Sequence, residues 1–88
     1  MGPLEEIIRN RIRDHFPTST FTLLNESKRH QGHKGHTGGN ETHFHLILYD
    51  KAFEGCSSLQ RQRQVIPLFQ DLMQEGLHAL SMELMPPT

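Results

Sequence analysis

The chain has 88 residues, a net charge of −1 with neutral histidines, and a single cysteine. A chain of this size buries only about 60% of its unfolded surface, which predicts one domain, residues 1–88, with one modest core. The charge lacks the positive excess with which proteins bind DNA or RNA phosphates. One cysteine excludes both an internal disulfide framework and a cysteine-rich zinc site.

The sequence contains no apolar run long enough to span a membrane, and its first residues lack the basic and apolar blocks of a signal peptide. We therefore expect an intracellular protein, cytoplasmic or mitochondrial, that is not secreted and makes no membrane contact.

The first predicted element is a helix from Pro3 to about His15. Proline suits the first helical position, acidic side chains follow it, and apolar residues recur at helical spacing until Pro17 ends the pattern. Two strands are predicted next, over 20–25 and 42–49, where β-branched and aromatic residues are frequent.

In the second strand, apolar residues at even positions alternate with a set that includes His43 and His45. This alternation is typical of a sheet with one buried face. We place the two histidines on its exposed face, where a solvated role is expected.

The segment after Gly55 predicts a helix capped by Ser57 or Ser58. Pro67 lies inside the helical pattern, and we expect a kink or two abutting helices there because proline removes a backbone donor. One side of the helix is apolar, with two more apolar residues beside it: Leu59, Ile66, Phe69 and Met73, then Val65 and Leu72.

A last strand is predicted over 78–84. The helical crossover makes the second and third strands parallel, and the first strand pairs antiparallel with the second. The expected fold is therefore α+β, in the order α-β-β-α-α-β, with a three-stranded mixed sheet and helices packed on one face.

Residues 26–41 contain no apolar residue, and we expect a flexible loop rich in histidine and glycine. His30, His33 and His36 recur at every third position, which fits either a metal-binding tract or a merely solvated loop. The run Gly-His-Lys-Gly that contains Lys34 also matches the G-x-x-G clamp of KH domains, although that clamp joins two helices.

His78 stands just before the last predicted strand. It is either part of an incomplete metal site shared with other ligands or a hydrogen-bonded histidine at the edge of the core. Cys56 has no sequence partner that marks a nucleophile, and we expect no enzymatic activity. Arg61 and Arg63 are most simply a solvated helix face, with partner docking as the second interpretation.

Together these residues resemble the BolA family over nearly the whole chain. The segments that carry the resemblance, in the family's order, are Asn25-Glu26-Ser27-x-x-His30, Glu41-Thr42-His43-Phe44, Phe53-Glu54-Gly55, Leu59-Gln60-Arg61-x-Arg63-x-Val65 and His78-Ala79-Leu80. The resemblance implies a KH-like fold and a non-enzymatic adaptor. Such an adaptor pairs with a monothiol glutaredoxin and helps to bind, assemble or traffic 2Fe-2S clusters in iron homeostasis.

The resemblance also implies the site. His78 falls on the family's C-terminal histidine ligand and His30 on its loop histidine, while His33 and His36 are less favoured alternatives in a loop longer than usual. The cluster would be shared with glutaredoxin and glutathione, with no cofactor expected in the isolated chain. Gln62 stands where the family commonly has the histidine of Arg-His-Arg.

Some bacterial members of the family are transcription regulators. A KH-like nucleic-acid-binding regulator is therefore the alternative function, with weak contacts expected from Arg61, Arg63 and Lys34.

Overall fold

The computed structural model of the chain describes residues 2–26 and 43–87, which have an α+β fold. Its elements follow the predicted order, with two short 3-10 helices added. They are α1 (Pro3–His15), β1 (Thr20–Asn25), β2 (His43–Tyr49), η2 (Lys51–Phe53), α2 (Ser58–Val65), η3 (Ile66–Leu68), α3 (Gln70–Gln74) and β3 (Ala79–Met85). None of the helices in these two segments is long and apolar enough to cross a membrane.

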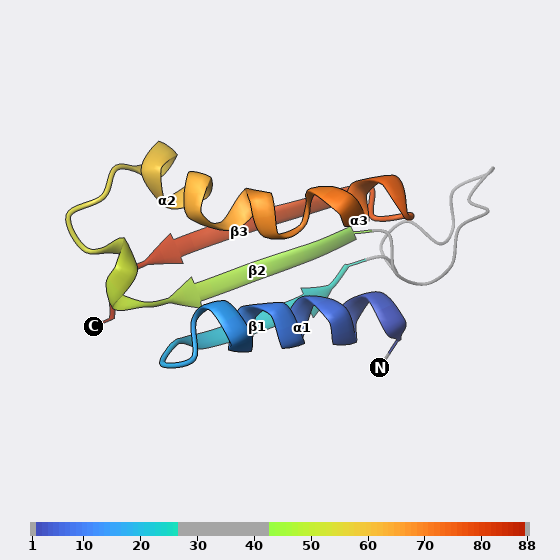
Figure 1. Cartoon of the computed structure of the whole chain (residues 1–88), viewed down its shortest axis with the longest axis horizontal. Helices are drawn as coiled ribbons and strands as arrows, with labels where there is room; N and C mark the ends of the chain where they lie inside the picture. The colour runs from blue at the N-terminus through green and yellow to red at the C-terminus, as the bar shows by residue number, and fades with distance from the viewer. Residues whose placement is uncertain (1, 27–42, 88) are drawn as a thin grey trace.

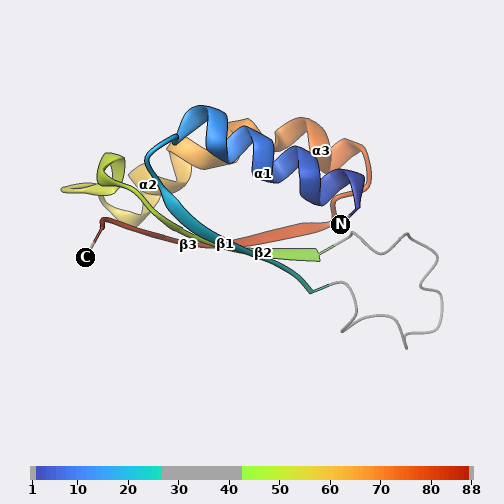
Figure 2. The same ribbon diagram turned by 90° about the horizontal axis from the view of Figure 1, so that it is seen from below.

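The three strands form one sheet in the order β1-β2-β3 (Figure 1). β1 runs antiparallel to β2, and β3 runs parallel to β2, so both predicted pairings are confirmed. Figure 2 shows that the helices cover one face of this sheet and leave the other face open. The prediction of helices on a single face is therefore confirmed as well.

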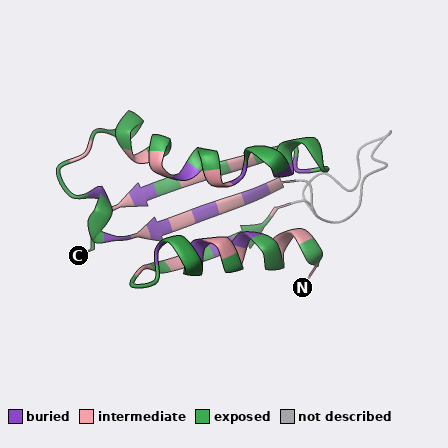
Figure 3. Ribbon diagram, in the orientation of Figure 1, coloured by how far each residue is buried: buried purple, intermediate pink, exposed green. Residues whose placement is uncertain are grey.

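The core lies between the sheet and the helices. Along β2, Phe44, Leu46 and Leu48 are buried and face the helices, while the residues between them are half-buried on the open face (Figure 3). From the opposite layer, α1 contributes Ile8 and Ile12. Burying one such side chain contributes about 1.5–3 kcal/mol, so this alternation is what fixes the sheet's orientation.

The crossover between β2 and β3 begins at a capping box. The Ser57 side chain accepts a hydrogen bond from the backbone of Gln60 at 3.1 Å, and the Gln60 side chain accepts one from the backbone of Ser57 at 2.8 Å. Pro67 lies in η3 between α2 and α3, so the predicted interruption of the helix is confirmed.

The apolar side of this crossover differs from the prediction. Val65, Phe69 and Leu72 are buried, whereas three other apolar residues of the pattern face solvent: Leu59, Ile66 and Met73 are 56%, 38% and 48% exposed. The break at Pro67 changes the phase of the helical repeat, so a single continuous stripe cannot face the core.

Candidate functional site

The candidate site lies at the end of the sheet where β2 and β3 begin. His43 pairs with Ala79 as the first step of the parallel register. The backbone N–H of Glu26, just past β1, donates to the carbonyl of His43 at 2.8 Å. Three chain segments that are far apart in the sequence therefore meet at one rim.

A turn after α3 brings His78 to this rim. Gly76 has φ +122°, a conformation that glycine adopts without the strain a side chain would cause. Leu77 is then buried, and its backbone N–H donates to the carbonyl of Leu72 at 3.0 Å. With Leu77 anchored in the core, His78 follows as an exposed residue immediately before β3.

His78 is exposed, so the interpretation that places it at the edge of the core is wrong, and its role as a metal ligand stays a prediction. That alternative assumed that His78 lies within the strand and points to the same side as Leu80. The strand starts at Ala79, so the alternation of side-chain direction does not extend to His78.

His43 is the neighbour of His78. Their ring centroids lie 5.8 Å apart with the ring planes at 85°, an edge-to-face arrangement. His43 lies on the open face as predicted, but it is half-buried rather than fully solvated. Sequence reasoning missed this pairing, because the parallel register that brings the two histidines together is not visible in either segment alone.

Imidazole nitrogens are suitable ligands for zinc and iron. Within 2–26 and 43–87, no group of three or more histidine, cysteine, aspartate or glutamate side chains is placed to hold a metal ion. The His43–His78 pair brings two imidazoles together at the rim. The predicted ligand His30, the alternatives His33 and His36, and the predicted contact Lys34 lie outside the described residues, as does nearly all of the predicted flexible loop over 26–41.

His45 makes a separate cross-strand cluster on the open face. Its Nδ1 lies 2.6 Å from Ser81 Oγ, and its Nε2 lies 2.7 Å from Glu83 Oε2. The ring therefore bridges two side chains of the neighbouring strand. His45 is thus held along β3 and is not free to join the rim.

Arg61 differs from the solvated side chain that the sequence favoured. Its Nε donates to the carbonyl of Cys56 at 3.0 Å, and its Nη1 donates to the carbonyl of Leu84 at 2.8 Å. It therefore ties the start of α2 to the end of β3. Arg63 is exposed, as expected for a solvated helix face.

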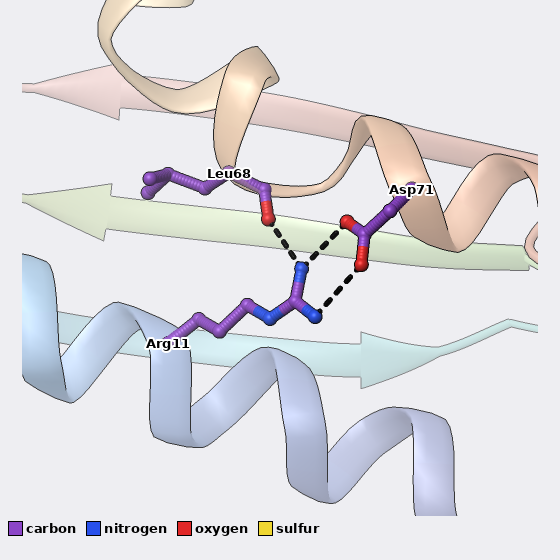
Figure 4. Close-up of polar contacts among 3 residues, drawn as sticks. All are labelled: Arg11, Leu68 and Asp71. Atoms are coloured by element: carbon purple, nitrogen blue, oxygen red, sulfur yellow. Dashed lines mark hydrogen bonds and ion pairs between the residues drawn. The ribbon is translucent and has the colours of Figure 1, made fainter.

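The α3 segment that leads to His78 is attached to α1 by Arg11 (Figure 4). Arg11 donates to both carboxylate oxygens of Asp71, at 2.7 and 2.9 Å, and to the carbonyl of Leu68 at 2.7 Å. The hydrogen bonds from Arg11 hold the pKa of Asp71 below its usual range, and the same bonds raise the pKa of Arg11.

Comparison with known proteins identifies the relatives of this chain. The family model described as BolA-like protein matches residues 12–88. The UV-induced protein uvi31 of Schizosaccharomyces pombe is 37% identical over 83 residues, which cover 91% of this chain and 80% of that protein. SufE-like protein 1, chloroplastic/mitochondrial, from Arabidopsis thaliana is 36% identical over 78 residues, which cover 84% of this chain but 21% of that longer protein.

Among solved structures, BolA1 from Arabidopsis thaliana superimposes with a TM-score of 0.84 at 29% identity, covering 99% of this chain and 95% of that one. The resemblance seen in short sequence segments therefore extends to the whole fold.

Proposed function

Because this chain belongs to the BolA family, we propose that it is a binding adaptor that pairs with a monothiol glutaredoxin and helps to bind, assemble or traffic 2Fe-2S clusters. Family membership is consistent with a role related to iron-sulfur chemistry. The observation that carries the finer proposal is the exposed His78 beside His43 at the rim of the sheet.

In this proposal the chain supplies nitrogen donors and the partner supplies sulfur donors. His78 provides the principal nitrogen, because it is exposed and its backbone is fixed by the buried Leu77. His30 is the second candidate from the family resemblance. Glutaredoxin cysteine and the thiolate of glutathione would complete the site. Imidazole ligands raise the reduction potential of an iron-sulfur centre relative to thiolates, and protonation releases them.

The proposed role is binding and not catalysis. We expect the cluster to be cargo that passes through the complex, with none held by the isolated chain. We also expect a cytoplasmic or mitochondrial location, and one relative bears a chloroplastic/mitochondrial label.

The alternative of a nucleic-acid-binding regulator has less support. The side chain of Arg61 is bound to two backbone carbonyls. Of the predicted nucleic-acid contacts that lie among the described residues, only Arg63 is exposed. A single exposed cation supplies little of the phosphate neutralisation on which nucleic-acid affinity depends.

The test is to mix the chain with a cluster-loaded monothiol glutaredoxin and to record visible circular dichroism. A histidine-ligated mixed cluster changes that spectrum. His78→Ala removes the change, while the matched control His15→Ala, an exposed histidine at the end of α1, retains it. His30→Ala should reduce the spectral change less than His78→Ala, because His33 or His36 can take its place as the ligand. Replacing His33 and His36 as well should reveal the full effect of losing His30.

The proposed function is overturned if the wild-type chain leaves the spectrum unchanged and size-exclusion chromatography at the same concentrations shows no complex. A changed spectrum that His78→Ala retains overturns the assignment of His78 as a ligand.

A further inference from the structure

A groove runs along the outer side of β3, between that strand and the crossover helices. Its polar half is a hollow of about 240 Å³ lined by Cys56, Ser58, Arg61, Gln62, Met82 and Leu84. Its apolar half is a smaller hollow of about 40 Å³ lined by Ile66, Phe69, Gln70, Met73, Leu80 and Met82. Met82 lines both, so the two hollows are neighbours along the strand.

The floor of this groove carries free backbone groups. The N–H of Asp50 donates to the carbonyl of Met85 at 3.0 Å, so the backbone of Met85 points toward β2. Backbone direction alternates along a strand, so Leu80, Met82 and Leu84 point away from β2, toward the outer edge. Arg61 occupies the carbonyl of Leu84. No residue within 2–26 or 43–87 pairs with the outward N–H and C=O groups of Leu80 and Met82.

The other edge of the sheet, β1, also has one carbonyl bound by an arginine. On β1, Arg9 Nη2 donates to the carbonyl of Leu23 at 3.3 Å. The guanidinium groups of Arg9 and Arg13 each lie 5.8 Å from the ring centroid of Phe21. An edge strand with unpaired backbone groups is a template for pairing with another strand, and β3 offers the outward groups of Leu80 and Met82 for this among the described residues.

The polar half of the groove carries an uncompensated positive charge. Arg61 uses its Nε and Nη1 to bind carbonyls, and no carboxylate among the described residues forms an ion pair with it. Its Nη2 is the remaining nitrogen, and Arg61 lines this hollow together with Ser58 and Gln62. A carboxylate from outside the chain matches this half in charge.

The apolar half lies beside exposed side chains. Ile66 and Met73 both line the hollow and are among the most exposed large apolar residues of the described chain. Methionine adapts its shape to different apolar groups, and Met73 and Met82 both line this half. The apolar half is therefore suited to an apolar side chain from a partner.

We propose that this groove binds an extended segment of a partner protein, which pairs with β3 as a fourth strand. The segment places an apolar side chain between Ile66 and Met73 and a carboxylate near Arg61. Leu80 and Leu84 are about 13 Å apart at the usual rise of a strand, so these two groups are four residues apart in the partner and share one face. This proposal does not depend on the proposed cluster role.

A peptide fits the groove better than a nucleic acid. The outward groups of Leu80 and Met82 present donors and acceptors with the spacing of a peptide backbone. The groove offers one cation, Arg61, and a run of phosphates would need several.

The test uses synthetic peptides of about ten residues in which leucine and aspartate stand four positions apart among valine and threonine, made in both orders. Binding is measured by fluorescence anisotropy. We expect one order to bind and to slow hydrogen exchange of the Leu80 and Met82 amides. The same peptide with N-methylated amides along one edge should lose binding, because it can no longer donate to β3.

Matched variants separate the two halves. Met73→Gln should weaken binding about tenfold, while Leu24→Gln, at a comparably exposed apolar residue on the open face, should not. Arg61→Gln should weaken binding of the aspartate peptide more than binding of the asparagine version, because only the aspartate peptide loses an ion pair. That comparison is independent of any effect of Arg61 on stability.

Three outcomes overturn the proposal. One is that neither order binds, or that binding survives N-methylation on both edges. Another is that single-stranded oligonucleotides bind the groove and displace the peptide. The third is seen without peptide: the Leu80 and Met82 amides become protected from hydrogen exchange as the protein concentration rises, and the mass doubles. A second copy of the chain then occupies the groove.

Discussion

The carboxylate of Asp71 accepts two hydrogen bonds from the guanidinium of Arg11, at 2.7 and 2.9 Å, and so joins α3 to α1. This ion pair makes stability depend on pH. The pKa of Asp71 is lowered in the folded state by the hydrogen bonds from Arg11. A lowered folded-state pKa gives stability that is present above the unfolded value, about 3.9, and is lost as pH falls through the folded value.

We therefore expect Asp71→Asn to reduce the free energy of unfolding at pH 7 by a small amount, because the pair is exposed and screened by water. The difference from wild type should close as the pH is lowered below the unfolded pKa, and it should shrink in high salt. Urea unfolding at neutral and acidic pH measures this. Asp14→Asn, at an exposed carboxylate of α1 for which the described residues offer no ionic partner, is the control. A difference that persists in acid would contradict the prediction.

Two neighbouring residues of β2 test the assignment of the core. Leu46 is fully buried and Ile47 is half-buried on the open face. Leu46→Ala should cost about 2–5 kcal/mol, a large share of the stability of so small a domain, because it removes buried surface and leaves a cavity. Ile47→Thr keeps the β-branched shape and should cost clearly less. Equal losses in thermal or urea unfolding would mean that the sheet faces are assigned incorrectly.

The capping box gives a second stability test. Ser57→Ala should lower the free energy of unfolding by about 1 kcal/mol, because the backbone N–H of Gln60 loses its acceptor. Ser58→Ala, one residue inside the helix, should have little effect. The sequence left both serines open as caps, and denaturant midpoints that rank the two variants in the opposite order would contradict the observed geometry.

The histidine pair leads to a spectroscopic prediction. His43→Ala should shift the visible circular dichroism of a mixed cluster without abolishing it, because its ring lies 5.8 Å from that of His78. His78→Ala should leave the thermal midpoint of the free chain nearly unchanged, because the side chain is exposed. His45→Ala, which removes contacts to Ser81 and Glu83, should instead lower stability and leave the spectrum as it was. A destabilisation of several kcal/mol by His78→Ala would show that this residue is structural.

Binding to duplex DNA should be weaker than about micromolar at physiological salt, because few cations are available. Fluorescence anisotropy over a range of salt concentrations measures it. Tight, salt-resistant and sequence-selective binding would favour the regulator over the adaptor.

Much of the fold is predictable because local chemistry and global packing agree. Pro3 and Pro17 frame α1, the alternation in β2 sets which face is buried, and the crossover length requires parallel pairing with β3. Pro67 interrupts the second helical segment where expected.

Other features depend on relations that no single segment contains. Ile66 and Met73 are exposed because the break at Pro67 changes which side of each short helix faces the core. The short distance between the rings of His43 and His78 depends on the register between β2 and β3. The hydrogen bonds from Arg61 to backbone carbonyls depend on the position of α2 relative to β3. These features make up most of the candidate site and the groove, and they become visible only in three dimensions.

The parallel pairing of β2 and β3 also has a consequence for folding order. His43 begins β2 and His78 comes just before β3, and the whole helical crossover separates them, so they meet only after this long connection has closed. Non-local pairing of this kind forms late, after local helices and turns. In a nascent or partly unfolded chain the two imidazoles are therefore not held together, and the rim is complete only in molecules whose C-terminal strand is already docked.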